Sequence, residues 1–338
     1  MLRVGIVGAG LIGTRRAAVV RQTPGCELGA VADVNLGRAQ QACAGTAARA
    51  TAFWEEVTAD PTLDAVVVAT PNKFASSIVL AAASHGKHVL CEKPLGRNAA
   101  EAREMVDAAH HARVTLKTGF NHRHHPAVMR GHDVVASGAI GEPFFLRCVY
   151  GHGGRPGYER EWRGNPDLAG GGELLDQGVH VMDLSRWFLG DFSEVTGFTA
   201  RWFWDIDPLE DNGLALMRTV SGRVASVHTS WTQWKNQFLL EVFGREGFVR
   251  IEGLGGSYGV ERLIVGKRRP ESGPPDSVTE EFPGPDNSWH DEWQEFLSAL
   301  AEKREPLANG IDGWKALVLI DAVYHSARFG RIVHVDQL

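Results

Sequence analysis

The sequence predicts an α/β protein with two domains: an N-terminal domain built on a doubly wound parallel sheet, and a C-terminal α+β domain with an open, largely antiparallel sheet. In the first third of the chain, short apolar segments alternate with alanine-rich helical segments, as in parallel sheets whose strands are buried on both faces. After residue 120, apolar segments follow one another across short turns, which indicates antiparallel pairing. The 338 residues are enough for two domains, and we expect these to span 1–121 and 122–338.

Turn signals end the predicted elements of the first domain. The first strand runs directly into the glycine-rich stretch 8–13, and Pro24-Gly25 ends the helix that follows. The third apolar segment stops at Pro71 and the fourth at Glu92-Lys93-Pro94. The expected strands are 2–7, 27–34, 65–70 and 88–91, and the expected helices are 14–22, 35–48, 73–84 and 98–111.

The pattern of the second domain predicts a series of strands with helices before and after it. The expected strands are 144–150, 194–204, 214–220, 223–231, 237–243, 247–251 and a terminal 331–335, and the expected helices are 174–188, 288–303 and 311–328. The segment Pro270–Pro275 is expected to form a loop. Tryptophans at 202, 204, 231 and 234 alternate as strand residues do, which favours packing against the sheet of another subunit.

The glycine-rich stretch has the spacing of a dinucleotide-binding turn, with Gly8, Gly10 and Gly13 between a strand and a helix. Gly8 permits the tight turn, Gly10 lets a pyrophosphate approach, and Gly13 lets the helix pack against the strand. The backbone N–H groups at the helix start, from Leu11 and Ile12, would face the phosphates. The alternative is a glycine-rich turn without a ligand.

Asp33 supports the dinucleotide interpretation, because it lies 20 residues after Gly13 at the end of the second strand. Its carboxylate would accept hydrogen bonds from a ribose 2′-hydroxyl and repel a 2′-phosphate, so we expect NAD rather than NADP. Arg38 leaves NADP open, because an arginine at this place can bind a 2′-phosphate.

Composition excludes several classes of protein. A net charge of −6 gives no basic surface for nucleic acid or an anionic membrane, and no apolar run approaches the roughly 18 residues of a membrane span. The start MLRVGIVGAG lacks the pattern of a signal peptide, and four scattered cysteines read as reduced thiols. We expect a cytoplasmic protein.

Two groups of residues are candidates for catalysis. Asp176 and His180 are four residues apart, so on a helix they share one face, where the carboxylate could raise the basicity of the imidazole. Lys93 follows a predicted parallel strand, where ligands bind in such sheets, and its ammonium group could stabilise a developing alkoxide. By themselves, these patterns are also typical of a surface pair and a solvated loop lysine. We expect the chemistry to lie where the two halves meet.

Several motifs in order resemble those of the Gfo/Idh/MocA oxidoreductases, which include glucose–fructose oxidoreductase and inositol dehydrogenases. These motifs are GAGLIG at 8–13, ATPN at 69–72, CEKPL at 91–95, GFNHR at 119–123 and GGGELLDQGVHVMDL at 170–184. The stretch DAVYHSARFGRIVHV at 321–335 also resembles the family's C-terminal end, so the likeness covers nearly the whole chain.

The resemblance implies a Rossmann domain followed by a domain whose sheet packs against another subunit, giving a homodimer or homotetramer. It implies that His180 exchanges the proton, that Asp176 supports it, and that Lys93 places the nicotinamide and the substrate hydroxyl. It also implies cofactor contacts from residues at the ends of the strands, namely Thr70, Asn72, Glu92 and Asn121.

The expected reaction is hydride transfer between a nicotinamide and a secondary alcohol or ketone of a sugar, sugar derivative or cyclitol. Besides Lys93 and His180, the candidate substrate residues are Arg123, His152, Trp162 and Arg163, with Trp162 equally open to a packing role. We expect no metal, because His122, His124 and His125 lack Cys or Asp partners at ligand spacing. Two alternatives stay open: a redox-neutral NAD-using glycosidase, and a non-enzymatic dinucleotide-binding regulator.

Overall fold

The computed structural model describes residues 1–337 and divides into two compact units, each made of three stretches of chain. Unit 1 contains Met1–Phe120, Asp167–Gly170 and Trp289–Lys315. Unit 2 contains Asn121–Pro166, Gly171–Ser288 and the chain from Ala316 onward. The domain ranges 1–121 and 122–338 stay a prediction.

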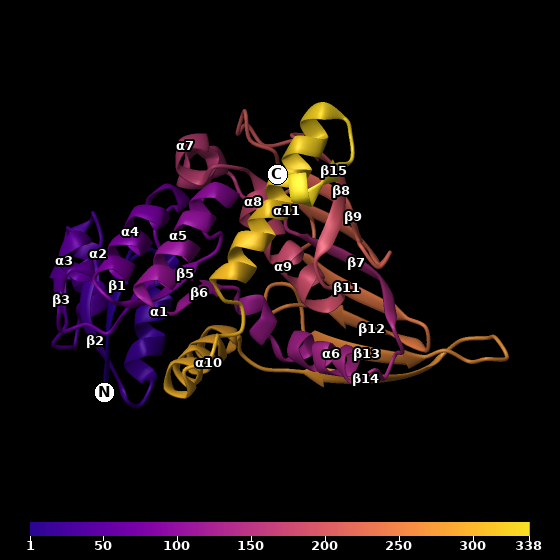
Figure 1. Ribbon diagram of the computed structural model, residues 1–338, viewed down its shortest axis with the longest axis horizontal. Helices are drawn as coiled ribbons and strands as arrows, with labels where there is room; N and C mark the ends of the chain where they lie inside the picture. Colours follow the sequence, from indigo (N-terminus) through magenta and orange to yellow (C-terminus); the bar gives the residue numbers. More distant parts are fainter. Residues whose placement is uncertain (338) are drawn as a thin grey trace. The chain divides into compact units, whose positions relative to one another are not determined.

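The sheet of unit 1 is a parallel, six-stranded Rossmann sheet with the strand order β3-β2-β1-β4-β5-β6 (Figure 1). Its strand order reverses between β1 and β4, the position at which ligands bind in such folds. The strands are β1 (Leu2–Val7), β2 (Cys26–Ala32), β3 (Arg49–Thr51), β4 (Ala65–Val68), β5 (His88–Glu92) and β6 (Leu116–Gly119).

Unit 1 has an apolar core of valine, isoleucine and alanine side chains from β1, α1, β2 and α2. Trp293 and Phe296 of α10 are fully buried in this core, although they come from the last quarter of the sequence. The helices that lie in this unit, wholly or for all but their first residue, are α1 (Leu11–Gln22), α2 (Leu36–Cys43), α3 (Glu55–Thr58), α4 (Asn72–Ser84), α5 (Ala99–Ala112), α7 (Pro166–Ala169) and α10 (Ser288–Glu302).

Unit 2 is built on a nine-stranded sheet with the order β14-β13-β12-β11-β7-β10-β9-β8-β15. Every neighbouring pair is antiparallel except β7 and β10, so the sheet is open, mixed and mostly antiparallel. The strands are β7 (Pro143–Gly151), β8 (Phe192–Ala200), β9 (Asn212–Thr219), β10 (Val224–Ser230), β11 (Gln237–Gly244), β12 (Gly247–Glu252), β13 (Glu261–Lys267), β14 (Asp276–Phe282) and β15 (Val333–His334).

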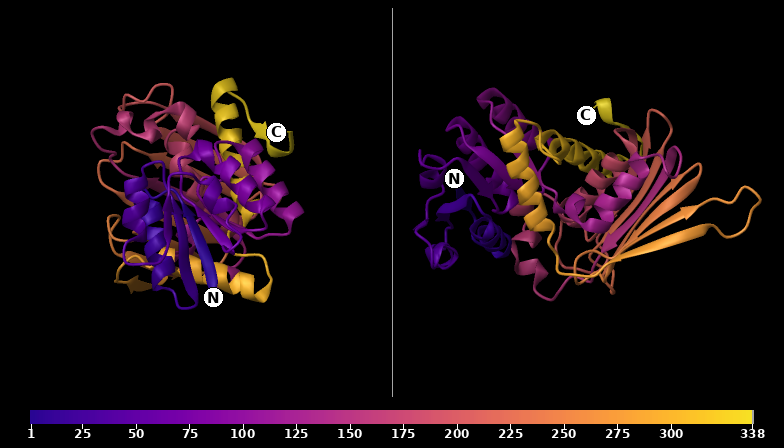
Figure 2. Two further views of the ribbon diagram at one scale, coloured as in Figure 1. Left: turned by 90° about the vertical axis from the view of Figure 1, so that its left-hand side faces the viewer. Right: turned by 90° about the horizontal axis from the view of Figure 1, so that it is seen from below.

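Helices of unit 2 cover one face of this sheet (Figure 2). Helix α6 (Pro126–Ala136) lies over β12 and β13, and α9 (Gly178–Leu189) lies over β7 and β10. Near β8, α11 (Gly310–Phe329) packs on the same face, since a Cβ on Gly197 would lie 2.8 Å from Cγ1 of Val323 in α11. A four-residue helix, α8 (Glu173–Asp176), precedes α9.

The structure confirms the predicted fold class and adds seven helices and strands to it, namely β3, α3, β6, α6, α7, β13 and β14. Two expectations were wrong. The predicted helix 174–188 is interrupted at Gln177, and the predicted strand 194–204 ends at Ala200. Trp202 and Trp204 therefore lie in a loop, where their backbone N–H groups donate to the Asp211 carboxylate, and do not alternate along a strand.

Candidate functional site

Contacts in the turn after β1 require glycine at two of its three positions. Gly8 has a φ of +93°, and a Cβ on it would lie 2.4 Å from the carbonyl oxygen of Ala69. A Cβ on Gly13 would lie 1.7 Å from the carbonyl oxygen of Gly8. By contrast, a Cβ on Gly10 would meet nothing within 4 Å among the described residues. Gly8 and Gly13 serve the fold, whereas the space at Gly10 is open to a ligand.

The N-terminus of α1 has no side-chain cap within the part of the chain that the structure describes. Gly10 is the N-cap residue, and Leu11 in the first turn is 81% exposed. Free N–H groups and the positive end of the helix dipole favour an anion at this end of a helix. This twelve-residue helix therefore presents the feature that dinucleotide-binding turns use for phosphate.

Asp33 follows β2 and faces the glycine turn. Its carboxylate accepts hydrogen bonds from the N–H of Ala9 at 2.7 Å and from the N–H of Asn35 at 2.8 Å. Two N–H bonds leave acceptor capacity on a carboxylate, which has about four lone-pair sites. Arg38 is exposed on α2, with its backbone N–H bound to the Asn35 side chain.

Thr70 lies after β4, next to the position where the strand order reverses. Its Oγ1 is buried and has no hydrogen-bond partner in residues 1–337. Buried hydroxyl groups are normally hydrogen-bonded, so this one is suited to a ligand. The orphaned hydroxyl, the open space at Gly10 and the uncapped helix together fit a dinucleotide.

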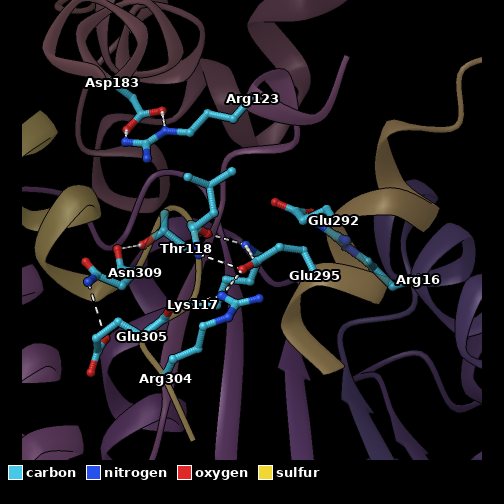
Figure 3. Close-up of polar contacts among 11 residues, drawn as sticks. Arg16, Lys117, Thr118, Arg123, Asp183, Glu292, Glu295, Arg304, Glu305 and Asn309 are labelled. Carbon is cyan, nitrogen blue, oxygen red and sulfur yellow. Dashed lines mark hydrogen bonds and ion pairs between the residues drawn. The ribbon is translucent and has the colours of Figure 1, made fainter. Parts of the chain in front are cut away.

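Lys93 directly follows β5, and the preceding Glu92 forms a buried ion-pair cluster with Arg16 and Glu292, of which Figure 3 draws the last two. Arg16 of α1 donates from Nε to Glu92 at 2.7 Å and from Nη2 to Glu292 of α10. Arg16 is 1% exposed. Burial alone would lower the pKa of Arg16, but the two carboxylates raise it above its ordinary value. The segment before Lys93 is thereby fixed to two helices of unit 1.

Asn72 at the start of α4 holds a second segment in unit 1. Its side-chain amide donates to the carbonyl oxygen of Ala169 at 2.8 Å. Lys73 pairs with Asp167 at 2.5 Å, and Arg97 donates to the Asp167 carbonyl oxygen at 3.1 Å. These contacts hold Asp167–Gly170, the stretch that leads into the Asp176 and His180 motif.

In unit 2, Glu210 holds the start of that motif. Its carboxylate accepts from the N–H groups of Gly172 and Leu174, at 3.1 and 3.0 Å, and from the hydroxyl of Tyr324 at 2.8 Å. Burial raises the pKa of Glu210, although each of these hydrogen bonds favours its ionised form. Glu210 thus takes the place of a side-chain cap at the N-terminus of α8.

Asp176 pairs with Arg163, which the sequence had offered as a substrate residue. The guanidinium Nε donates to Asp176 Oδ2 at 3.0 Å, and its carbon lies 4.5 Å from the centre of the Trp162 ring. The Asp176 carboxylate is the main cause that raises the pKa of Arg163. Trp162 and Arg163 therefore form a layer that orients Asp176.

His180 is buried at the start of α9, and its ring stacks on that of His122, with 3.6 Å between centroids. His152 accepts at Nδ1 from the N–H of Gly154, and its Nε2 lies 3.4 Å from the amide nitrogen of Gln177. Unit 2 thus brings His152 and Arg163 to the segment 176–177.

Arg123 is held by a residue of α9. It forms a two-pronged ion pair with Asp183 of α9, at 2.8 and 2.5 Å, and both side chains are buried (Figure 3). This ion pair engages Nε and Nη2 of Arg123, and the expected contact of Arg123 with substrate stays a prediction. The side-chain amide of Asn121 likewise donates to the Ser288 hydroxyl, at 2.9 Å.

The sequence does not reveal that four residues lie around the predicted site segments, the end of β5 and the Asp176 and His180 motif. These residues are Arg16, His122, Glu210 and Glu292. Arg16 and Glu292 are 276 residues apart, so no local pattern joins them. The sequence suggests His122 only as a metal ligand, and no motif in it singles out Glu210. A charged residue in an otherwise apolar helix stripe, such as Arg16 in α1, was the one available signal.

Comparisons with known proteins identify the family. The model of the "Oxidoreductase family, NAD-binding Rossmann fold" matches residues 2–120, and that of the "GFO/IDH/MocA C-terminal domain" matches residues 128–250. The chain belongs to the Gfo/Idh/MocA family. This membership makes it an NAD(P)-binding oxidoreductase related to sugar dehydrogenases.

Relatives and solved structures within the Gfo/Idh/MocA family cover much of the chain. Levoglucosan dehydrogenase of Pseudarthrobacter phenanthrenivorans is 32% identical over 65% of this chain and 59% of its own length. 1,5-Anhydro-D-fructose reductase of Ensifer adhaerens is 32% identical over 83% of each chain. A levoglucosan dehydrogenase structure in complex with NADH and levoglucosan has a TM-score of 0.90 at 26% identity, covering 100% of both chains.

None of the helices in residues 1–337 is both long and apolar enough to span a membrane.

Proposed function

We propose that this protein is an NAD-dependent dehydrogenase or reductase that acts on a secondary alcohol or ketone of a sugar, sugar derivative or cyclitol. The proposal is carried by Lys93, Asp176 and His180, each of which occupies a motif position of the Gfo/Idh/MocA family, to which the chain belongs. Relatives named for levoglucosan and 1,5-anhydro-D-fructose support a sugar as substrate. We also propose a cytoplasmic location, which the four free thiols support.

The dinucleotide would be held by the turn after β1. Backbone N–H groups of Leu11 and Ile12 bind the phosphates, Asp33 accepts hydrogen bonds from a ribose, and the Thr70 hydroxyl gains the partner that it lacks in residues 1–337. The Asp33 carboxylate favours NAD over NADP, because a 2′-phosphate would place like charges together. Bound NAD supplies the hydride acceptor of the reaction.

His180 takes the hydroxyl proton as the substrate is oxidised and returns it in the reverse reaction. Lys93 stabilises the negative charge that develops on the substrate oxygen. Asp176, held by Arg163, supports the imidazolium form of His180. Trp162, whose ring packs on the Arg163 guanidinium, and His152, beside Gln177, are candidates for sugar contacts.

We assign Asn72, Glu92 and Asn121 a positioning role near the cofactor. Their side chains are engaged with Ala169, Arg16 and Ser288, respectively. Each of them thereby fixes the backbone next to a strand end, where Thr70, Lys93 and the turn after β6 lie.

The test is the change in absorbance at 340 nm with NAD or NADP, across levoglucosan, anhydro sugars, aldoses and inositols. We expect NADH to form with one class of polyol, and His180→Ala to lose this turnover by at least about 100-fold while still binding NADH. The matched control is His132→Ala, since His132 of α6 also stacks on an aromatic ring, that of Trp187. Turnover that persists in His180→Ala would contradict the mechanism. Substrate conversion without net NADH would favour the redox-neutral alternative.

A further inference from the structure

His122 lies flat against His180. Their ring centroids are 3.6 Å apart, the planes differ by 17°, and both rings are buried. The two residues come from different parts of the chain: His122 from the short turn Asn121–His124 after β6, and His180 from the first turn of α9. Face-to-face contact at this distance restricts the plane that the His180 ring can adopt.

Other rings of unit 2 hold His122 at its edges. Tyr150 of β7 lies at 5.3 Å, His125 at 5.6 Å and Phe238 of β11 at 6.2 Å, all in edge-on geometry. Such T-shaped contacts between aromatic rings are favourable and directional. The His122 ring is therefore held in one orientation and cannot rotate together with the His180 ring.

The neighbours of His122 also disfavour a charge on it. His125 pairs with Glu261 at 2.6 Å, and this contact, against the effect of burial, keeps the pKa of Glu261 below its usual range. A proton on His122 would lie against the ring of His180, at 3.6 Å between centroids, so like charges would repel each other there if both rings were protonated in this buried place. A neutral aromatic face, in turn, attracts a cation lying over it.

We infer that His122 is a positioning residue for the proposed reaction: it fixes the ring plane of His180 and stays neutral while His180 carries the proton. The inference rests on the proposed function, in which His180 accepts the substrate hydroxyl proton. No proton passes to His122 in this step. Its contribution comes from its flat ring, and its nitrogen atoms are not required.

The experiment compares His122→Phe with His122→Leu. Phenylalanine retains a flat ring of similar size, whereas leucine fills the volume without one. We expect His122→Leu to lower kcat about 100-fold, because a displaced catalytic group can cost that much, and to leave the KM for NAD unchanged. The kcat of His122→Phe should stay within about threefold of the wild-type value, since an aromatic ring still stacks on His180. His132→Ala removes another stacked histidine of unit 2 and should not alter kcat.

NMR of the protein without cofactor or substrate gives a second readout. A ring stacked on His180 shifts the His180 Hε1 resonance upfield, and the missing signal in His180→Ala assigns it. We expect this shift to persist in His122→Phe and to vanish in His122→Leu. The result that overturns the inference is a wild-type kcat for His122→Leu, or an equal loss of kcat in both variants.

The failure of the proposed function would look different. In that case either His180→Ala would keep turnover or the wild type would oxidise no polyol. The upfield shift of the His180 Hε1 resonance would still depend on the ring at position 122. If His180→Ala loses turnover but the His180 Hε1 resonance of the wild type is not shifted upfield, the proposed dehydrogenase function stands and the positioning role of His122 is excluded.

Discussion

Single residues of the turn after β1 carry separate tasks that the sequence pattern does not distinguish. The spacing of Gly8, Gly10 and Gly13 predicts the turn, yet only the contacts reveal that Gly13 is required by the backbone of Gly8 and that Gly10 faces open space. Asp33 was predicted from spacing alone, and its two hydrogen bonds from Ala9 and Asn35 explain why it faces the turn.

Alanine at these glycines should therefore act on different properties. In Gly13→Ala, the new Cβ would overlap the Gly8 carbonyl oxygen, so we expect a loss of folding stability of about 2 kcal/mol or more. In Gly10→Ala, whose φ of −71° suits alanine, we expect unchanged thermal unfolding and NADH affinity reduced at least about tenfold. Unfolding curves and NADH fluorescence titrations measure both. Equal stability losses in the two variants would contradict the assignment.

The cofactor preference depends on Asp33. Asp33→Asn removes the charge that repels a 2′-phosphate while Arg38 stays available, so we expect the NADP-to-NAD ratio of kcat/KM to rise at least about tenfold. Asp64→Asn is the matched control, because Asp64 also accepts a backbone N–H, from Arg3 at 2.7 Å, but lies before β4 and away from the strand ends that follow the glycine turn. An unchanged ratio in Asp33→Asn would show that another group selects the cofactor.

At the scale of elements, α10 illustrates what local patterns cannot provide. The sequence predicts a helix over 288–303, but its place in the core of unit 1 depends on Trp293 and Phe296 meeting side chains from the first 90 residues. The Arg16, Glu92 and Glu292 cluster joins α1, β5 and α10 across the same distance in sequence.

Removing Arg16 should strongly destabilise unit 1. Arg16→Met removes the ion-pair partner of the buried Glu292 carboxylate, so we expect a loss of about 3–5 kcal/mol in the free energy of unfolding. The exposed cross-strand pair of Arg262 and Glu281 is the comparison, and Arg262→Met should cost less than about 1 kcal/mol. Denaturant unfolding measures the free energy of unfolding of both variants. Similarly small losses in the two would mean that the Arg16, Glu92 and Glu292 cluster does not contribute to stability.

Glu295 of α10 predicts a pH dependence of stability. Burial alone would raise its pKa, but the Lys117 ammonium at 2.8 Å, Arg304 and the N–H of Leu307 keep it below its ordinary value (Figure 3). A lowered folded-state pKa stabilises the fold above the unfolded-state value, and this contribution disappears as pH falls through the folded-state value.

The free energy of unfolding of the wild type should therefore fall as the pH decreases from about 5 to about 3, and Glu295→Gln should show a smaller slope there. At neutral pH, Glu295→Gln should be the less stable protein, because Lys117 then loses its charged partner. Glu104→Gln, an exposed glutamate of α5, is the control and should keep the wild-type slope. A wild-type slope in Glu295→Gln would remove this carboxylate as the cause.

On the scale of the whole chain, the N-terminal sheet was predictable because its strands are short, apolar and followed by turn signals. The later strands were harder. Asp276–Phe282 is almost wholly exposed and has no apolar alternation, so β14 leaves no periodic signal. Trp202 and Trp204 alternate in sequence, yet the carboxylate of Asp211 organises their loop, and that contact is visible only in three dimensions.

The sheet of unit 2 also bears on assembly. A Cβ on Gly197 of β8 would meet Val323 of α11, so the helices lie on that face, and strand alternation puts Phe198 and Leu216 on the opposite face. These two side chains are 72% and 52% exposed. Exposed apolar side chains on one sheet face are typical of a surface that another subunit covers.

We therefore expect light scattering after gel filtration to give a multiple of 36.8 kDa, corresponding to a homodimer or homotetramer. Phe198→Glu combined with Leu216→Glu would bury unpaired carboxylates in such an interface and should yield the monomer mass. Val220→Glu is the control, because Val220 lies in the turn after β9 and is exposed without belonging to the sheet face. A monomeric wild type, or a double variant that keeps the larger mass, would exclude this face as the interface.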